Sequence, residues 1–128
     1  MTIQLVNLSE KDNKHLSRLI ARGEILPVMN NTKWSELIGE MREAGEMQPQ
    51  FRLHSVLAPL EFVTNWDGDW HYHIQPIKEI EWLDLRAESQ DWIFSTLAKH
   101  SIPYSIEDGL VRIWGYTRSG AQPNWHVA

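Results

Sequence analysis

The stretch QFRLHSVL, residues 50–57, marks the point at which the hydrophobic pattern of the chain changes. Before it, apolar residues recur every three or four positions, as on one face of a helix. From residue 50 onward they alternate with polar residues, as in a half-buried strand. Three later runs share the strand pattern: LEFVTNW (60–66), WHYHIQP (70–76) and EIEWLDL (79–85). Because Pro59 and an Asp-Gly pair separate the first of these runs from their neighbours, we expect an antiparallel sheet in the middle of the chain.

Two helices are expected ahead of this sheet. The first runs from about Ser9, a residue type that caps helix N-termini, to the arginine before Gly23, a common helix stop. The second lies in NNTKWSELIGEMREAG (30–45), where Asn31 or Thr32 can provide the cap. Apolar residues recur at helical spacing in both runs, so each helix should bury one face.

A third helix and a hairpin are expected after the sheet has begun. The helix starts near Ser89 in ESQDWIFSTLAKHSI (88–102), and YSIEDGLVRIWGYT (104–117) predicts a hairpin. Its turn is Asp108-Gly109, a dipeptide that two-residue hairpin turns prefer. The predicted fold class is therefore α+β, with two N-terminal helices and an antiparallel sheet of about five to six strands crossed by one further helix.

Composition limits the class of protein. At 128 residues the chain fits one domain that can bury a core without disulfides, and the absence of cysteine excludes a thiol nucleophile. No apolar run reaches the roughly 18 residues of a membrane span, and the first residues lack a signal-peptide pattern. We therefore expect a cytoplasmic protein with no membrane partner.

The charge of the chain is uneven. The net charge is −5, and residues 31–100 carry twelve acidic and six basic side chains. Because nucleic acid is bound through a basic face, we expect no nucleic-acid partner. An acidic middle segment instead favours a basic protein partner.

The run TNWDGDWHYHIQP, residues 64–76, holds two acids, two histidines and two tryptophans. A three-residue loop, Asp67-Gly68-Asp69, would pair Trp66 with Trp70 across a hairpin. The mostly apolar face would then carry Leu60, Phe62, Thr64, Trp66, Trp70, Tyr72 and Ile74. His71 and His73 would stand side by side on the more polar face, because alternate strand residues point the same way.

Two histidines placed in this way can supply two ligands to a metal ion. A catalytic zinc usually has a third protein ligand, for which Glu61 and His54 are the candidates, although the spacing requires neither. Zinc bound by His71 and His73 is therefore one hypothesis for this run. A polar face without a metal is the other.

Signatures of enzymes are absent from the sequence. It has no G-x-S-x-G, P-loop, H-E-x-x-H or dinucleotide fingerprint. Asp67 and Asp69 beside a glycine are typical of turns, and nothing fixes them at the separation that a glycosidase needs. We therefore expect a protein without catalytic residues. Seven tryptophans are many for this length, and any that lie at the surface would favour protein binding.

Several spaced motifs resemble an uncharacterised bacterial family of small domains. They are NNTKW (30–34), WDGDWHYH (66–73), I-E-W (80–82) and the Gly-Tyr of IWGYTR (113–118). Members of this family open with N-T-K-W and carry W-D-G-x-W, and the resemblance covers about residues 29–118. It implies a single α+β domain there, preceded by an N-terminal helical extension (1–28) and followed by a C-terminal tail (119–128). Members look like small acidic proteins encoded near polymorphic toxins, so the resemblance implies an immunity-type function.

The leading hypothesis is a non-enzymatic protein-binding protein, an immunity protein that neutralises a cognate bacterial toxin by binding its active-site region. Acidic side chains would then act as decoys in a site built for phosphate. The candidate contact residues are Trp66, Asp67, Asp69, Trp70, Glu79, Glu81 and Asp84. The alternative is a metal-dependent enzyme or small-ligand binder that uses His71 and His73. A third hypothesis is a subunit of a larger assembly, docked through the basic side of the first helix.

Overall fold

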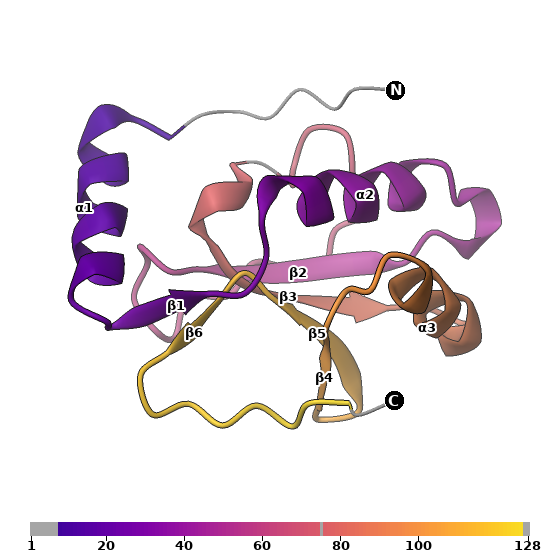
Figure 1. Cartoon of the computed structure of the whole chain (residues 1–128). Helices are drawn as coiled ribbons and strands as arrows, with labels where there is room; N and C mark the ends of the chain where they lie inside the picture. The colour runs from indigo at the N-terminus through magenta and orange to yellow at the C-terminus, as the bar shows by residue number, and fades with distance from the viewer. Residues whose placement is uncertain (1–7, 75, 127–128) are drawn as a thin grey trace.

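The computed structural model describes residues 8–74 and 76–126 as an α+β fold (Figure 1). The three helices are α1 (Glu10–Ala21), α2 (Asn31–Arg42) and α3 (Gln90–Lys99), with short 3-10 turns η1 (Gly45–Met47) and η2 (Ile77–Glu79). The strands are β1 (Ile25–Pro27), β2 (Gln50–Ser55), β3 (Ile80–Arg86), β4 (Ser105–Glu107), β5 (Leu110–Trp114) and β6 (Tyr116–Arg118). They form an antiparallel sheet of order β2-β3-β5-β4 and a separate antiparallel pair, β1-β6.

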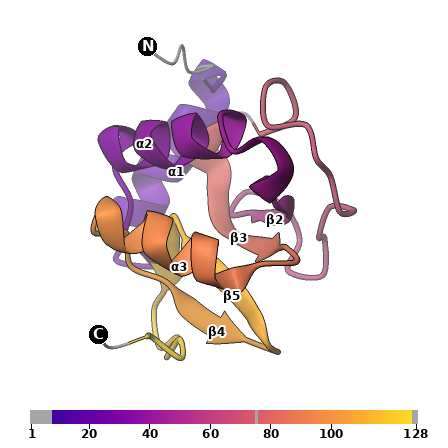
Figure 2. The same ribbon diagram turned by 90° about the vertical axis from the view of Figure 1, so that its right-hand side faces the viewer.

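The main core lies between the larger sheet and two helices. Figure 2 shows α2 and α3 together on one side of the sheet. Leu53, Leu83 and Ile113 follow one another across β2, β3 and β5 on the face that the helices cover. Packed against this face are buried helical residues, namely Trp34, Leu37, Ile38, Met41, Ile93 and Leu97. Burial of such a face is the main stabilising contribution in a domain of this size.

A second, smaller core joins α1 to the β1-β6 pair. Leu16 of α1 packs there with Ile25 of β1 and Val56. Ile25 pairs with Arg118 of β6, so part of the segment expected to be an N-terminal extension is hydrogen-bonded into the fold. Gly115, between β5 and β6, allows the chain to pass close to β3, because a Cβ at this position would lie only 2.1 Å from the carbonyl oxygen of Ile80.

The local signals for helices and turns agree with the structure in most places. Ser9 caps α1 as expected, accepting the amide hydrogen of Asp12 at 3.2 Å. The cap of α2 is Asn30, one residue earlier than expected, and its side chain accepts from the amide of Lys33 at 2.8 Å. The β4-β5 hairpin turns at Asp108-Gly109, both with positive φ, as a type I′ turn requires.

The predicted hairpin over residues 60–76 is wrong. The described part of this segment is irregular, and it runs beside the edge of β2 without forming a ladder of its own. The amide of Thr64 donates to the carbonyl of Leu53 at 3.0 Å, and Asp67 exchanges two backbone hydrogen bonds of 2.8 Å with Phe51. The segment thus covers an edge that would otherwise be open to pairing with another chain.

Candidate functional site

The W-D-G-x-W motif forms two successive turns built by its own acidic side chains. Oδ1 of Asp67 accepts the amide hydrogen of Asp69 at 2.7 Å, and Oδ1 of Asp69 accepts those of His71 and Tyr72 at 3.0 Å each. Short side chains that bond to nearby amides compete in this way with a regular ladder. This local chemistry explains why the segment is not a strand.

Trp70 anchors these turns in the core. Its side chain is fully buried against Phe51, and its Nε1–H donates to the carbonyl of Pro49 at 2.8 Å. Arg42 of α2 holds the same turn from the other side, with Nε donating to the carbonyl of Trp70 at 2.9 Å and a second nitrogen to that of His71 at 3.1 Å. The motif therefore has a rigid base.

A cleft of about 200 Å³ lies beside this turn, between β2 and η2. Its apolar walls are Phe51, Leu53, Ile74, Pro76 and Ile80. Its polar lining consists of Thr64, Asp67, His73 and Glu79. The cleft thus combines hydrophobic walls with two carboxyl groups.

Asp67 and His73 form a hydrogen-bonded pair in the cleft. Nδ1 of His73 lies 2.6 Å from Oδ2 of Asp67, and its Nε2 lies 3.6 Å from a carboxylate oxygen of Asp69. Because an ionised carboxylate can only accept, Nδ1 is the donor. The pKa of Asp67 is held below its ordinary value, chiefly by the amide of Asp69 and further by His73, against the opposing effect of burial.

Glu79 shows the opposite shift. Its pKa is raised, first by burial and then by the negative charge of Asp12 on α1. Both causes act in the same direction, because each disfavours the charged carboxylate. Negative charges from two parts of the chain therefore converge on the cleft.

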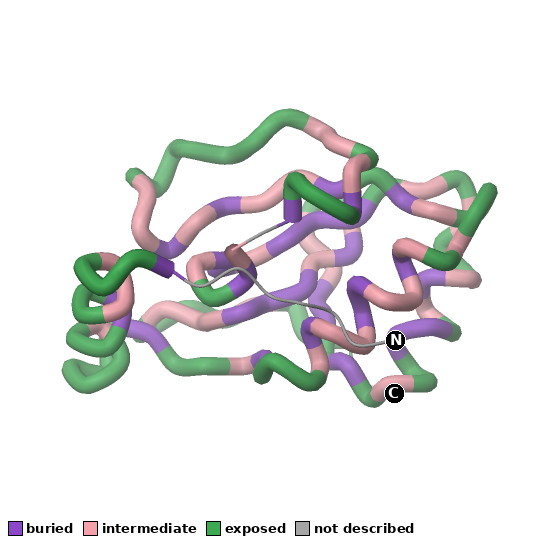
Figure 3. Tube along the Cα trace, turned by 90° about the horizontal axis from the view of Figure 1, so that it is seen from above, coloured by how far each residue is buried: buried purple, intermediate pink, exposed green. Residues whose placement is uncertain are grey.

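Exposed hydrophobic side chains precede the motif. Phe62 and Leu60 are 67% and 70% exposed, and Tyr72, two residues after the motif, is 83% exposed. Figure 3 shows residues 59–65 as a continuous exposed stretch of the chain. The exposure of Leu60 and Phe62 was not predicted, because both were expected on the apolar face of a hairpin. Glu61, Thr64 and Asn65 were the local signal of an exposed segment.

The structure separates the seven predicted contact residues into three groups. Asp67, Asp69 and Glu79 lie at or beside the cleft. Trp66 is half-buried beneath the guanidinium groups of Arg52 and Arg86, 4.9 and 4.3 Å from its ring centre. The other three, Trp70, Glu81 and Asp84, are buried and do not face a partner in this conformation.

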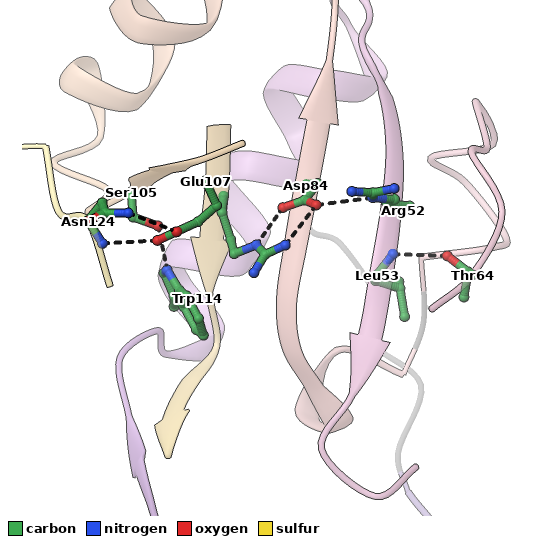
Figure 4. A network of polar contacts seen from close by, with 9 residues as sticks. Arg52, Leu53, Thr64, Asp84, Ser105, Glu107, Trp114 and Asn124 are labelled. Atoms are coloured by element: carbon green, nitrogen blue, oxygen red, sulfur yellow. Dashed lines mark hydrogen bonds and ion pairs between the residues drawn. The ribbon is translucent and has the colours of Figure 1, made fainter. Parts of the chain in front are cut away.

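Asp84 and Glu81 are neutralised by arginines from other strands. Asp84, with no exposed surface, accepts from Arg112 at 2.7 and 3.1 Å and from Arg52 at 3.1 Å (Figure 4). Glu81 accepts from Arg118 at 2.8 Å. These arginines are distant in sequence, so the pairing could not be read from local spacing.

The placement of His71 and His73 on one face of a strand, on which the metal hypothesis depended, is not found in the structure. His71 and His73 belong to turns, so the strand argument for their side-by-side placement does not apply. Within residues 8–74 and 76–126, no group of three or more His, Asp or Glu side chains is arranged to hold a metal ion.

The residues of the N-T-K-W motif also stabilise the fold. Helix α2 begins after the Asn30 cap, and the ammonium group of Lys33 donates a hydrogen bond to the carbonyl of His100 in the turn after α3. Trp34 is buried beside Gly115. Both motifs therefore stabilise the fold, and Asp67 and Asp69, which are partly exposed between the two tryptophans, also border the cleft.

Comparison with known proteins places the chain in a family without an assigned activity. The chain belongs to a family of unknown function (DUF6678), whose model matches residues 16–120. This range includes the second half of α1, both sheets and the cleft. No curated protein and no solved structure matches the chain. Among the described residues, the helices are too short or too polar to cross a membrane.

Proposed function

We propose that the chain is a protein-binding protein of the immunity type, which neutralises a cognate bacterial toxin by covering its active-site region. The observation that carries this proposal is the occurrence of an acidic cleft and of exposed Leu60, Phe62 and Tyr72 side chains in the same segment of the chain, which we propose to form one binding surface. Protein interfaces combine aromatic anchors with a polar rim. Phe62 and Tyr72 would be the anchors, and Asp67, Asp69 and Glu79 would contribute the charges.

The rigidity of the surface supports this proposal. The carbonyl of Phe62 accepts from Nδ1 of His54 at 2.7 Å, and the amide of Thr64 is bonded to the edge of β2. Trp70 fixes the following turn from below. Because binding then orders few additional groups, less conformational entropy opposes association.

The charge supports a basic partner. Residues 31–100 carry twice as many acidic as basic side chains, and one of the basic ones, Arg52, is paired with the buried Asp84. Enzymes that act on nucleic acids have basic active sites. An acidic surface complements such a site in charge.

The test uses any candidate toxin domain that is encoded beside the gene for this chain, purified with an inactivating substitution. Titration calorimetry should show a 1:1 complex with a Kd below about 1 µM, equivalent to roughly −8 kcal/mol. The active toxin should lose activity in proportion to the protein added. If the two proteins fail to associate at micromolar concentration, the proposal is overturned.

The second candidate, a metal-dependent enzyme or small-ligand binder that uses His71 and His73, is favoured by one observation. His73 lines the cleft with its imidazole oriented by Asp67 at 2.6 Å. Elemental analysis of protein purified without a histidine tag would test it. Stoichiometric zinc that is lost in the double variant His71→Ala, His73→Ala would support this candidate, and metal-free protein would exclude the metal-dependent form.

A further inference from the structure

The cleft beside β2 has the chemistry of a site for one long basic side chain. Arginine and lysine bury an apolar stem and keep a charged end in a polar environment. The lining of the cleft offers both kinds of surface: Leu53 and Pro76 are apolar and keep some exposure, and Asp67 and Glu79 are acidic. Acidic groups without such walls would not distinguish a side chain from a simple cation.

The size of the cleft indicates how much it can hold. Its volume of about 200 Å³ lies below the roughly 300–1,000 Å³ of sites for drug-sized ligands. A single side chain fits this volume, whereas a folded peptide segment does not. A protein partner would therefore enter the cleft with a single side chain.

The carboxyl groups can still accept hydrogen bonds. In Asp67, Oδ1 accepts from the amide of Asp69 and Oδ2 from His73, but each carboxylate oxygen can accept two hydrogen bonds. Within the described residues, Glu79 has no hydrogen bond or ion pair to a cationic side chain, and the negative charge of Asp12 lies near it.

We infer that this cleft receives one arginine side chain of the protein partner, with its stem against Leu53 and Pro76 and its guanidinium on Asp67 and Glu79. The inference rests on the proposed function, because it identifies what the partner contributes. Arginine is chosen over lysine because its planar fork can reach two carboxyl groups at once.

The experiment needs only the full chain and a small probe. Backbone amide NMR signals are followed during titration with N-acetyl-arginine methylamide, and with the citrulline analogue, which has nearly the same shape but no charge. We expect saturable shifts at Leu53, Thr64, Ile74 and Ile80 with arginine and none with citrulline. Equal shifts with both probes, or no saturable shift with arginine, would overturn the inference.

Variants assign the binding to the cleft. Glu79→Gln should weaken arginine binding about fivefold, the effect expected for a partly exposed ion pair. The matched control is Glu46→Gln, which removes an exposed acid outside the cleft and should leave the affinity unchanged. Equal losses in both variants would show non-specific attraction and contradict the inference. If Glu79→Gln fails to fold, Asp67→Asn replaces it, because asparagine keeps the oxygen that accepts from Asp69.

A lysine probe tests the choice of side chain. N-acetyl-lysine methylamide should bind more weakly than the arginine probe, and equal or tighter binding would contradict the assignment of arginine. None of these titrations contains the toxin. Failure here therefore leaves the toxin-binding result standing, and failure of toxin binding leaves the probe result standing.

Discussion

Replacing Asp84 by asparagine should cost the fold about 3 kcal/mol, because Asp84 is the buried anion between two arginines. Three hydrogen bonds from Arg52 and Arg112 end on its two oxygens, and the side chain has no exposed surface. Asparagine would turn one oxygen into an N–H donor that faces guanidinium hydrogens. Breaking a buried pair costs about 3–5 kcal/mol. The lower end applies because the side chains of Arg52 and Arg112 keep 32% and 18% of their exposure, so water can solvate the freed charges.

Urea denaturation of Asp84→Asn measures this loss, with an unchanged m-value as the condition for comparing free energies of unfolding. The control is Asp108→Asn at the exposed β4-β5 turn, where asparagine also tolerates positive φ and should change stability by less than about 0.5 kcal/mol. Replacing Asp84, Arg52 and Arg112 together by apolar residues should cost less than Asp84→Asn alone. A loss below about 1 kcal/mol in Asp84→Asn would refute the buried triad and return Asp84 to the list of candidate surface contacts.

Three further outcomes are expected. Gly115→Ala should destabilise the protein by about 1–3 kcal/mol, because the added Cβ would meet the carbonyl of Ile80. Gly68→Ala, with no described atom within 4 Å of its Cβ position, should be nearly neutral in urea denaturation. Equal effects of the two variants would contradict the close approach at Gly115. The lowered pKa of Asp67 adds stability that is present above the ordinary aspartate pKa near 3.8 and is lost as the pH falls through the lowered pKa. The difference in free energy of unfolding between the wild type and Asp67→Asn should therefore shrink between about pH 5 and pH 2. A constant difference would refute this. The pKa of Glu40 is lowered chiefly by its hydrogen bond with Lys99 and next by that with His100, so Lys99→Met should raise it. An unchanged titration of the Glu40 carboxyl group by NMR would exclude the contact with Lys99.

The sequence predicted those parts of the fold whose signals are local. The caps at Ser9 and beside Asn31, and the Asp108-Gly109 turn, each act within a few residues of their own position. The strand predicted over residues 79–85 nearly coincides with the central strand β3, Ile80–Arg86. The β1-β6 pair was not predicted, since three-residue strands have too few positions to show a period and their pairing spans the whole chain.

The candidate site was predicted in part, for a physical reason that individual residues make clear. The alternation over 60–76 looked like a hairpin, but Trp70 and Ile74 are buried on a chain of turns, and Asp67 and Asp69 satisfy the backbone amides that a ladder would have used. Charge alone could not separate Glu79 at the cleft from Asp84 in the interior. That distinction depends on arginines 28 and 32 positions away from Asp84.

The most direct measurement of the central claim compares toxin binding by two alanine variants of exposed hydrophobic residues. Phe62→Ala removes the proposed anchor, and Met47→Ala removes an exposed side chain in η1, outside the proposed surface. Titration calorimetry should show that Phe62→Ala weakens binding by at least about 2 kcal/mol, roughly thirtyfold, and that Met47→Ala retains the wild-type affinity. Wild-type affinity in Phe62→Ala, or an equal loss in Met47→Ala, would contradict the proposed binding surface.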